Sequence, residues 1–140
     1  MAVAGRAGLP LAVHVESASP AEVGLVGPVL ERRFVDARPE RLIGDKAYDS
    51  DGLDQQLAER GIEMIAPNRA KRRKTQDGRP LRRYRRRWKV ERLMAWLQNF
   101  RRIVTRYERR VENYLGFVHL GCNRILLRQP TFMARVLARA

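Results

Sequence analysis

Hydrophobic positions in the first half of the chain gather in short runs separated by turn-forming residues, a pattern typical of strands. Met1–Ala4 and Leu11–Val15 are β-prone, and the glycines and proline between them predict a hairpin. Two further short apolar stretches, Leu42–Ile43 and the alternating Ile62–Asn68, each predict one strand. The first half of the chain therefore predicts four strands.

Helical spacing of apolar residues appears twice between these strands. Ser19 is a candidate N-cap for a helix that continues to Phe34, and the Gly27–Pro28 pair is expected to kink or divide this helix. Asp51 can cap a second helix, which is expected to end at Gly61. The strands and helices thus alternate along the first half of the chain.

The second half has the apolar spacing of two longer helices after a basic loop over 68–80. The first helix is predicted from about Leu81 to Arg102, and the second from about Glu108 to Arg128. The element order β-β-α-β-α-β-loop-α-α predicts one mixed α/β domain over 1–129, followed by a C-terminal tail over 130–140. The expected core faces are Val90, Leu93, Leu97 and Phe100 on the first helix, and Val111, Leu115, Val118, Cys122 and Ile125 on the second.

Charge is distributed unevenly along the chain. Residues 1–68 hold 7 Lys/Arg and 11 Asp/Glu, a net charge of −4. Residues 69–140 hold 22 Lys/Arg and 4 Asp/Glu, a net charge of +18, and the two halves sum to the total of +14. Such asymmetry indicates a polyanionic partner, nucleic acid first. With one cysteine and two histidines, a disulfide framework and a His/Cys metal cluster are excluded, and no apolar run is long enough to span a membrane.

One acid, Glu91, stands alone among the arginines of the first long helix. At about 100° per residue, Tyr84, Arg87 and Glu91 share the side of the helix opposite its apolar face. An ion pair between Arg87 and Glu91, worth roughly 0.3–0.5 kcal/mol in a helix, explains this placement without any chemistry. The alternative is that Glu91 is a metal ligand and that Arg87 holds a phosphate beside it.

A second acid, Asp45, directly follows the predicted strand at Leu42–Ile43. Carboxylates at the carboxyl edge of a strand face the crevice where ligands bind in open α/β sheets. The alternative role, a turn or cap residue, suits Asp49, Asp51 and Asp54 better, because no helix is predicted to start at Asp45. Carboxylate oxygens suit Mg²⁺ and Mn²⁺, so Asp45 and Glu91 are candidate ligands for two-metal phosphoryl transfer.

Three separated segments resemble the C-terminal part of bacterial insertion-sequence transposases of the DDE type. The family signature Tyr-x2-Arg-x3-Glu-x6-Lys is matched by Tyr84, Arg87 and Glu91, with Gln98 at the position of the lysine. The segment GDKAYDSD resembles the second-acid motif and contains Asp45, and FRRIVTRYERRVENYLGFVHLGC resembles the family's tail. These segments occur in the family's order and spacing.

The resemblance implies a partial RNase H-like fold that lacks the first central strand and the catalytic Asp on it. It implies DNA transposition by DNA cleavage and strand transfer, with Mg²⁺ or Mn²⁺ bound by Asp45 and Glu91, and with activity impaired by truncation. The expected partner is DNA, as transposon ends and target, and no membrane is expected. Self-association or complementation by the missing N-terminal part is expected at the open sheet edges. The implied location is the bacterial cytoplasm, in association with the nucleoid.

Nucleic-acid contacts are expected mainly from the basic stretch 69–110, which holds 18 Lys/Arg and 3 Asp/Glu. Trp88, Trp96 and Tyr107 lie among these charges, and we interpret them as packing residues rather than as platforms for unpaired bases. A non-enzymatic basic nucleic-acid-binding domain, in which Asp45 and Glu91 are structural, remains the alternative function. The expected DNA-binding residues are Arg72, Arg73, Tyr84, Arg85, Arg87, Gln98, Arg101 and Arg102.

Overall fold

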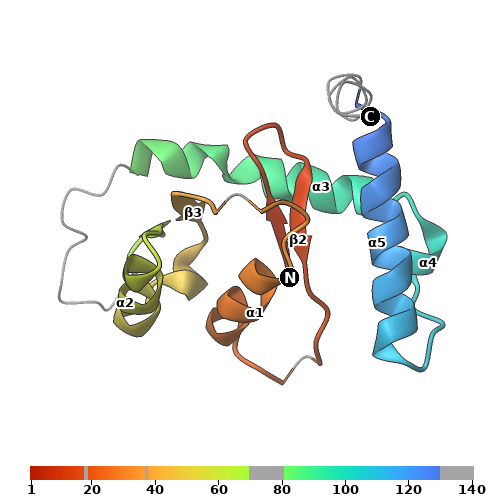
Figure 1. Cartoon of the computed structure of the whole chain (residues 1–140), viewed down its shortest axis with the longest axis horizontal. Coiled ribbons are helices and arrows are strands. Elements are labelled where there is room, and N and C mark those ends of the chain that lie inside the picture. Colours follow the sequence, from red (N-terminus) through yellow and green to blue (C-terminus); the bar gives the residue numbers. More distant parts are fainter. Residues whose placement is uncertain (18, 37, 70–80, 130–140) are drawn as a thin grey trace.

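The computed structural model of the 140-residue chain describes residues 1–17, 19–36, 38–69 and 81–129 (Figure 1). It confirms a mixed α/β architecture, with two small sheets and helices around them. The elements in chain order are β1 (Ala2–Ala4), β2 (Pro10–Val13), η1 (Glu22–Leu25), α1 (Val26–Glu31), β3 (Arg41–Ile43), η2 (Lys46–Tyr48), α2 (Asp51–Glu59), β4 (Glu63–Ile65), η3 (Leu81–Arg87), α3 (Trp88–Leu97), α4 (Arg101–Val104) and α5 (Val111–Leu127), where η marks a 3-10 helix.

The predicted hairpin is confirmed, because β1 pairs antiparallel with β2. The helical segment after it differs in detail from its prediction. Its N-cap is Ala21 and not Ser19, and it begins as the 3-10 helix η1 before α1 follows. The division falls just before Gly27–Pro28, which lie in the first turn of α1, where the missing N–H of proline removes no helical hydrogen bond.

The other two strands, β3 and β4, pair in parallel and are connected through α2. The prediction that Asp51 caps this helix is wrong, because Ser50 is the N-cap and its Oγ accepts from the Leu53 N–H at 3.5 Å. Asp51 is instead the first helical residue, where a negative charge suits the helix dipole. The end of the helix is as predicted, with Gly61 at a φ of 72°, a conformation that glycine adopts without strain.

Both sheets share one hydrophobic cluster on one face. Val3 and Ala12 from the hairpin meet Leu42 and Met64 from the parallel pair there, and α1 and α2 complete the cluster. On the other face, η3 packs against β3 and β4, and α3 packs against β1. Figure 1 shows η3 and α3 running along one side of both sheets, with α1 and α2 on the opposite side. The two sheets therefore lie in one layer between two helical layers.

The long basic helix predicted from Leu81 to Arg102 is divided into η3, α3 and α4, so its prediction as one helix is wrong. Gln98 is the C-cap of α3, and extended backbone at Phe100 separates α3 from α4. This break lets the chain turn so that α5 packs against β2, α3 and α4. The second cluster gathers at this junction, with Leu93, Leu97, Val118, Cys122 and Ile125 buried as the apolar stripes predict.

Candidate metal and DNA-binding site

The side chains of Tyr84, Arg87 and Glu91 form one connected group at the junction of η3 and α3. The Arg87 guanidinium donates to Glu91 Oε1 from Nε at 3.1 Å and from Nη2 at 2.8 Å. Its Nη1 donates to the Tyr84 hydroxyl at 3.2 Å, and its carbon lies 5.8 Å from the centre of the Tyr84 ring. The structure therefore brings together the three residues that the signature aligns.

The local helix types explain this grouping better than a uniform α-helix does. Tyr84 and Arg87 lie in the 3-10 segment η3, where side chains three residues apart are eclipsed. Glu91 lies in α3, four residues after Arg87, which is the spacing of neighbours along an α-helix. The change of helix type thus aligns both pairs on one side, whereas the prediction assumed one α-helix throughout.

The ion pair between Arg87 and Glu91, which was predicted as the simpler explanation for the position of Glu91, is present. Hydrogen bonding to Glu91, followed by the charge of Tyr84, raises the pKa of Arg87. Both of its bonds to the carboxylate end on Oε1, so Oε2 has no protein partner among the described residues. Glu91 is 57% exposed, so Oε2 can accept a cation while the ion pair stays in place.

Asp45 lies where β3 ends, but its side chain also has a local structural role. Its Oδ1 accepts a hydrogen bond from the Ala47 N–H at 2.8 Å, which makes Asp45 the N-cap of the 3-10 helix η2. The expectation that no helical turn starts at Asp45 is therefore wrong, because a single 3-10 turn leaves no apolar period in the sequence. Oδ2 of Asp45 accepts from none of the described residues, so it too is available to a cation.

Two residues that the sequence did not assign to the site hold the η2 turn. The buried Asp49 accepts from the Arg69 N–H at 2.8 Å through Oδ2. The Arg69 guanidinium donates to the carbonyls of Lys46 at 3.2 Å and Ala47 at 2.7 Å. These bonds connect the turn that contains Asp45 to the segment after β4. No sequence signal marks Arg69, because its guanidinium bonds backbone carbonyls and its bond to Asp49 uses the backbone N–H.

Tyr48, which closes this turn, is half-buried beside two acids. Burial, followed by the charges of Glu22 and Asp45, raises the pKa of the Tyr48 phenol. Its hydroxyl donates to Glu22 Oε2 at 3.2 Å. Tyr48 therefore remains neutral at physiological pH and ties the turn to η1.

The two candidate acids do not by themselves form a metal site. Over residues 1–17, 19–36, 38–69 and 81–129, no three His, Cys, Asp or Glu side chains gather in an arrangement that could hold a metal ion. The packing of η3 against β3 and β4 nevertheless places η3 beside β3, the strand that leads to Asp45. Metal binding at Asp45 and Glu91 stays a prediction, and it needs at least one further ligand.

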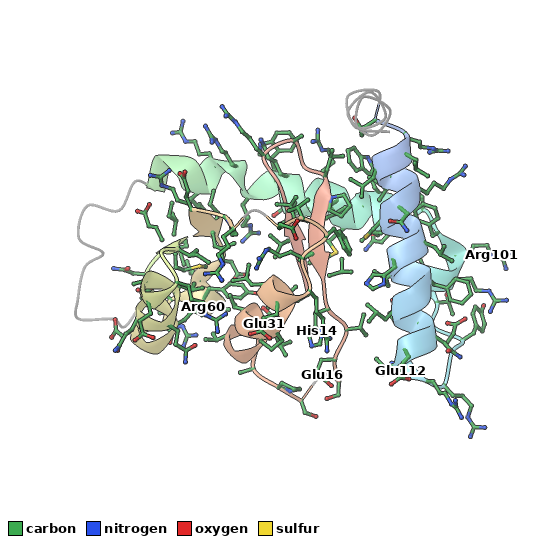
Figure 2. All side chains as sticks on the ribbon, in the orientation of Figure 1. His14, Glu16, Glu31, Arg60, Arg101 and Glu112 are labelled. Atoms are coloured by element: carbon green, nitrogen blue, oxygen red, sulfur yellow. The ribbon has the colours of Figure 1, made fainter. Side chains whose placement is uncertain are left out.

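The other expected DNA-binding residues are spread over a longer surface. Arg85 is exposed on η3, and Gln98 is exposed at the end of α3. Arg101 and Arg102 lie beyond the break, on α4, and Figure 2 shows Arg101 projecting outward at the edge of the molecule. Arg72 and Arg73 fall outside the described residues.

The interpretation of the aromatic residues holds for one of the three. Trp96 packs against the second cluster, as expected. Trp88 is 49% exposed and Tyr107 is 63% exposed, so the interpretation of these two as packing residues is wrong. Tyr107 lies in the connection between α4 and α5, outside the apolar stripes of both helices.

Comparison with known proteins groups this chain with transposases. A family model described as transposase DDE domain matches residues 1–123. Over 123 residues, the chain is 38% identical to a Burkholderia cepacia protein named as a transposase for insertion sequence element IS402; the match covers 82% of this chain and 56% of that relative. The chain thus spans about half the length of the curated relative it matches. No solved structure matches it. Among the described residues, none of the helices has the length and apolar character that crossing a membrane requires.

Proposed function

Because this chain belongs to the family of insertion-sequence transposases with a DDE domain, we propose that Asp45 and Glu91 are two of the three acids of its DNA-cleaving site. The observation that carries this proposal is the Tyr84–Arg87–Glu91 group, in which Arg87 fixes Glu91 through a single oxygen. An ion pair that only stabilises the helix needs no tyrosine at position 84. A site that places a phosphate beside a metal ligand uses both the Arg87 guanidinium and the Tyr84 hydroxyl as donors.

The donor set suits a divalent cation of the magnesium type. Asp45 and Glu91 each have one carboxylate oxygen bound within the protein and one without a partner among the described residues. Mg²⁺ and Mn²⁺ bind through one or two such carboxylates and complete their coordination with water and phosphate oxygens. When bound, the two ions of such a site activate the attacking oxygen and stabilise the leaving oxygen.

The residues of this chain would then position the DNA. Arg87 offers a planar guanidinium next to Glu91, which suits one phosphate of the scissile strand. The Tyr84 hydroxyl, 3.2 Å from Arg87 Nη1, keeps the guanidinium in place. Gln98 is a neutral donor where the family signature has lysine, so we expect a weaker phosphate contact there.

We further propose that the fold is RNase H-like, with one more strand between β1 and β3. The two sheets share a layer and a core but do not pair with each other. The outer edge of β2 is occupied, because Phe34 N–H donates to the Leu11 carbonyl at 2.8 Å. Along a strand, successive residues point their N–H and C=O groups alternately toward the partner strand and away from it. The N–H and C=O groups of Ala2 point away from β2, and those of Arg41 and Ile43 point away from β4.

A strand in this position would pair with both sheets and join them into one. In Figure 1, β3 lies on the β1 side of the hairpin, so the two open edges belong to neighbouring strands. The strand would come from a further segment of the protein or from a second chain, and an acid on it would supply the third ligand. Without it, we expect weak metal binding, low cleavage activity and association through the open edges.

DNA, as transposon ends and target, is the proposed partner, and the bacterial nucleoid is the proposed location. A non-enzymatic nucleic-acid-binding domain is the second candidate, favoured by the structural bonds of Asp45 and Glu91 and by the excess of arginines. Both candidates predict binding that weakens steeply with salt, by about 0.9 log units per phosphate contact for each log unit of salt. Salt dependence therefore does not separate them.

Cleavage by a protein in which this chain is joined to the part of its relative that the match does not cover separates the two functions. Mg²⁺-dependent nicking of labelled DNA is the readout, and Asp45→Asn and Glu91→Gln each test one acid. We expect both variants to lose nicking and to bind DNA at least as well as the parent. Glu112→Gln, at the far end of α5 (Figure 2), is the matched control and should nick normally. Unchanged nicking in Asp45→Asn and Glu91→Gln would support the non-enzymatic alternative.

A further inference from the structure

The connection between α4 and α5 presents an aromatic ring at the surface among many arginines. Tyr107, at 63% exposed, is among the most exposed large side chains of the described chain. A large aromatic residue gains stability when it is buried, so at this exposure the Tyr107 ring adds little to the core and is open to contact with a ligand. Its place beyond the break after α3 separates it from the Tyr84–Arg87–Glu91 group.

The loop that contains Tyr107 is held in one conformation by its neighbours. Glu108, with its side chain 8% exposed, accepts from the Tyr107 N–H at 3.2 Å and from Arg102 Nη1 at 3.2 Å. Arg106 donates to the carbonyls of Glu108 at 3.0 Å and Arg109 at 3.4 Å. The ring of Tyr107 is therefore presented on a fixed backbone, which lowers the entropic cost of binding a ligand there.

Positive charge surrounds this ring. Residues 101–110 contain five arginines and one acid, Glu108, and the charge of that acid is already paired with Arg102. The Arg102 guanidinium lies 5.6 Å from the centres of the Tyr107 and Phe117 rings. Arg101, Arg109 and Arg110 are exposed and make no side-chain bond to any described residue. Three cations within six positions of Tyr107 in the chain are thus available, and the Tyr107 ring is mostly open to solvent.

We propose that the α4–α5 loop binds an unpaired nucleobase on the Tyr107 ring, with the phosphates next to that base on Arg101, Arg109 and Arg110. The proposal rests on the DNA-binding function proposed above and names the form of DNA that this surface takes. Stacking needs an open aromatic face, and every base can use it irrespective of sequence. A fully paired duplex presents phosphates to the arginines but no free base to the ring, so single-stranded flanks are the favoured ligand.

Fluorescence anisotropy with two labelled probes tests this site in the full chain. One probe is a blunt duplex, and the other is the same duplex with a single-stranded extension of about six nucleotides. We expect the parent to bind the extended probe more tightly than the blunt probe at the same salt concentration. Tyr107→Ala should weaken binding to the extended probe by at least about fivefold while changing blunt-duplex binding little. Tyr107→Phe, which keeps the ring, should bind like the parent.

Matched controls separate stacking from folding and from charge. Val104→Ala changes an apolar residue that is 59% exposed just before the loop, and both affinities should stay as in the parent. Arg109→Ala should lower the salt slope for the extended probe by about 0.7, the value expected for one phosphate contact on a single strand. Thermal melts of all variants should overlap, because the changed side chains are exposed.

The outcomes distinguish failure of the stacking site from failure of the DNA-binding function on which it rests. Equal affinity of the parent for both probes, or equal binding by Tyr107→Ala and the parent, overturns the stacking site while DNA binding stands. A chain that binds neither probe overturns the proposed function and the site together. Loss of binding in Tyr107→Phe as well as in Tyr107→Ala would assign the effect to the hydroxyl and would also overturn stacking.

Discussion

The Arg87 guanidinium donates two hydrogen bonds to the same oxygen of the Glu91 carboxylate, from Nε at 3.1 Å and from Nη2 at 2.8 Å. A pair that shared both carboxylate oxygens would leave a cation only oxygens that already accept a hydrogen bond. In this geometry Oε2 stays available, so the ion pair and the proposed metal-ligand role are compatible. The ion pair orients the carboxylate, and the contribution of Arg87 to stability and to function can be measured separately.

Removing Arg87 separates these two contributions. Arg87→Ala should lower the free energy of unfolding by only about 0.3–0.5 kcal/mol, because the pair is exposed and the side chains lie one helical turn apart. DNA nicking by the joined protein should fall by about 100-fold or more, since a positioned phosphate contact is lost. Arg60→Ala, which removes a surface pair with Glu31 at 3.9 Å, is the control and should leave nicking unchanged (Figure 2). Equal nicking by Arg87→Ala and the parent would contradict the role of Arg87.

Asp49 should stabilise the turn that positions Asp45. Asp49→Ala removes a buried acceptor and leaves the Arg69 N–H without its partner, at a cost of about 1–3 kcal/mol in the free energy of unfolding. Chemical denaturation measures this difference. A cost below roughly 0.5 kcal/mol would indicate that the turn is held by other contacts.

Gly44, which follows β3, is expected to be required as glycine, because the side chains of Met64 and Tyr48 pack against its backbone. A Cβ there would lie 2.5 Å from Met64 Cε and 2.7 Å from Tyr48 Cδ2, so Gly44→Ala must displace a core methionine or the turn after Asp45. We expect a loss of about 1–3 kcal/mol in the free energy of unfolding. Gly52→Ala in α2, where the nearest atom is 4.0 Å away, should instead be neutral or stabilising by up to about 1 kcal/mol. Equal thermal stabilities of these two variants would contradict the packing described.

Cys122 should be unreactive in the folded chain. Burial raises the pKa of its thiol from 9.0 to about 11, because the thiolate is poorly solvated in the second cluster. The unfolded chain ionises this thiol above pH 9.0, whereas the folded chain does so only near pH 11, so the contribution of Cys122 to stability falls as pH rises between these values. Thiol-reagent kinetics near pH 8 should show slow labelling that becomes fast in denaturant. Fast labelling of the native chain would contradict the burial of Cys122.

The sequence predicted the strands and the apolar stripes well because both depend on periodic patterns. The β1–β2 hairpin and the strands β3 and β4 lie where alternation and turn residues predict them, and Cys122 is buried within its predicted stripe. Short 3-10 turns were missed, since three residues are too few to show a period. The division of the basic helix at Phe100 was missed for a related reason. No proline or glycine marks the break, and packing of α5 against α3 and α4 accompanies it.

The candidate site was predictable to the extent that its residues are close in the chain. Tyr84, Arg87 and Glu91 are three and four positions apart, so even the assumed single α-helix puts them on one side, although the change from η3 to α3 aligns them more closely. The bonds from Arg69 to Asp49 and to the η2 carbonyls connect residues 20 to 23 positions apart, and pattern alone does not predict such contacts. The role of Asp45 as an N-cap was missed because the turn it caps is so short.

Titration of the isotopically labelled chain with Mn²⁺, followed by NMR, tests the central claim most directly. A paramagnetic ion broadens amide signals near its ligands even when it binds weakly. If Asp45 and Glu91 hold one site, signals around both residues should broaden together at the same Mn²⁺ concentration, and Glu91→Gln should reduce the broadening at both. Broadening confined to the acidic segment Asp49–Asp54, or broadening around Asp45 that Glu91→Gln leaves unchanged, would contradict a shared metal site.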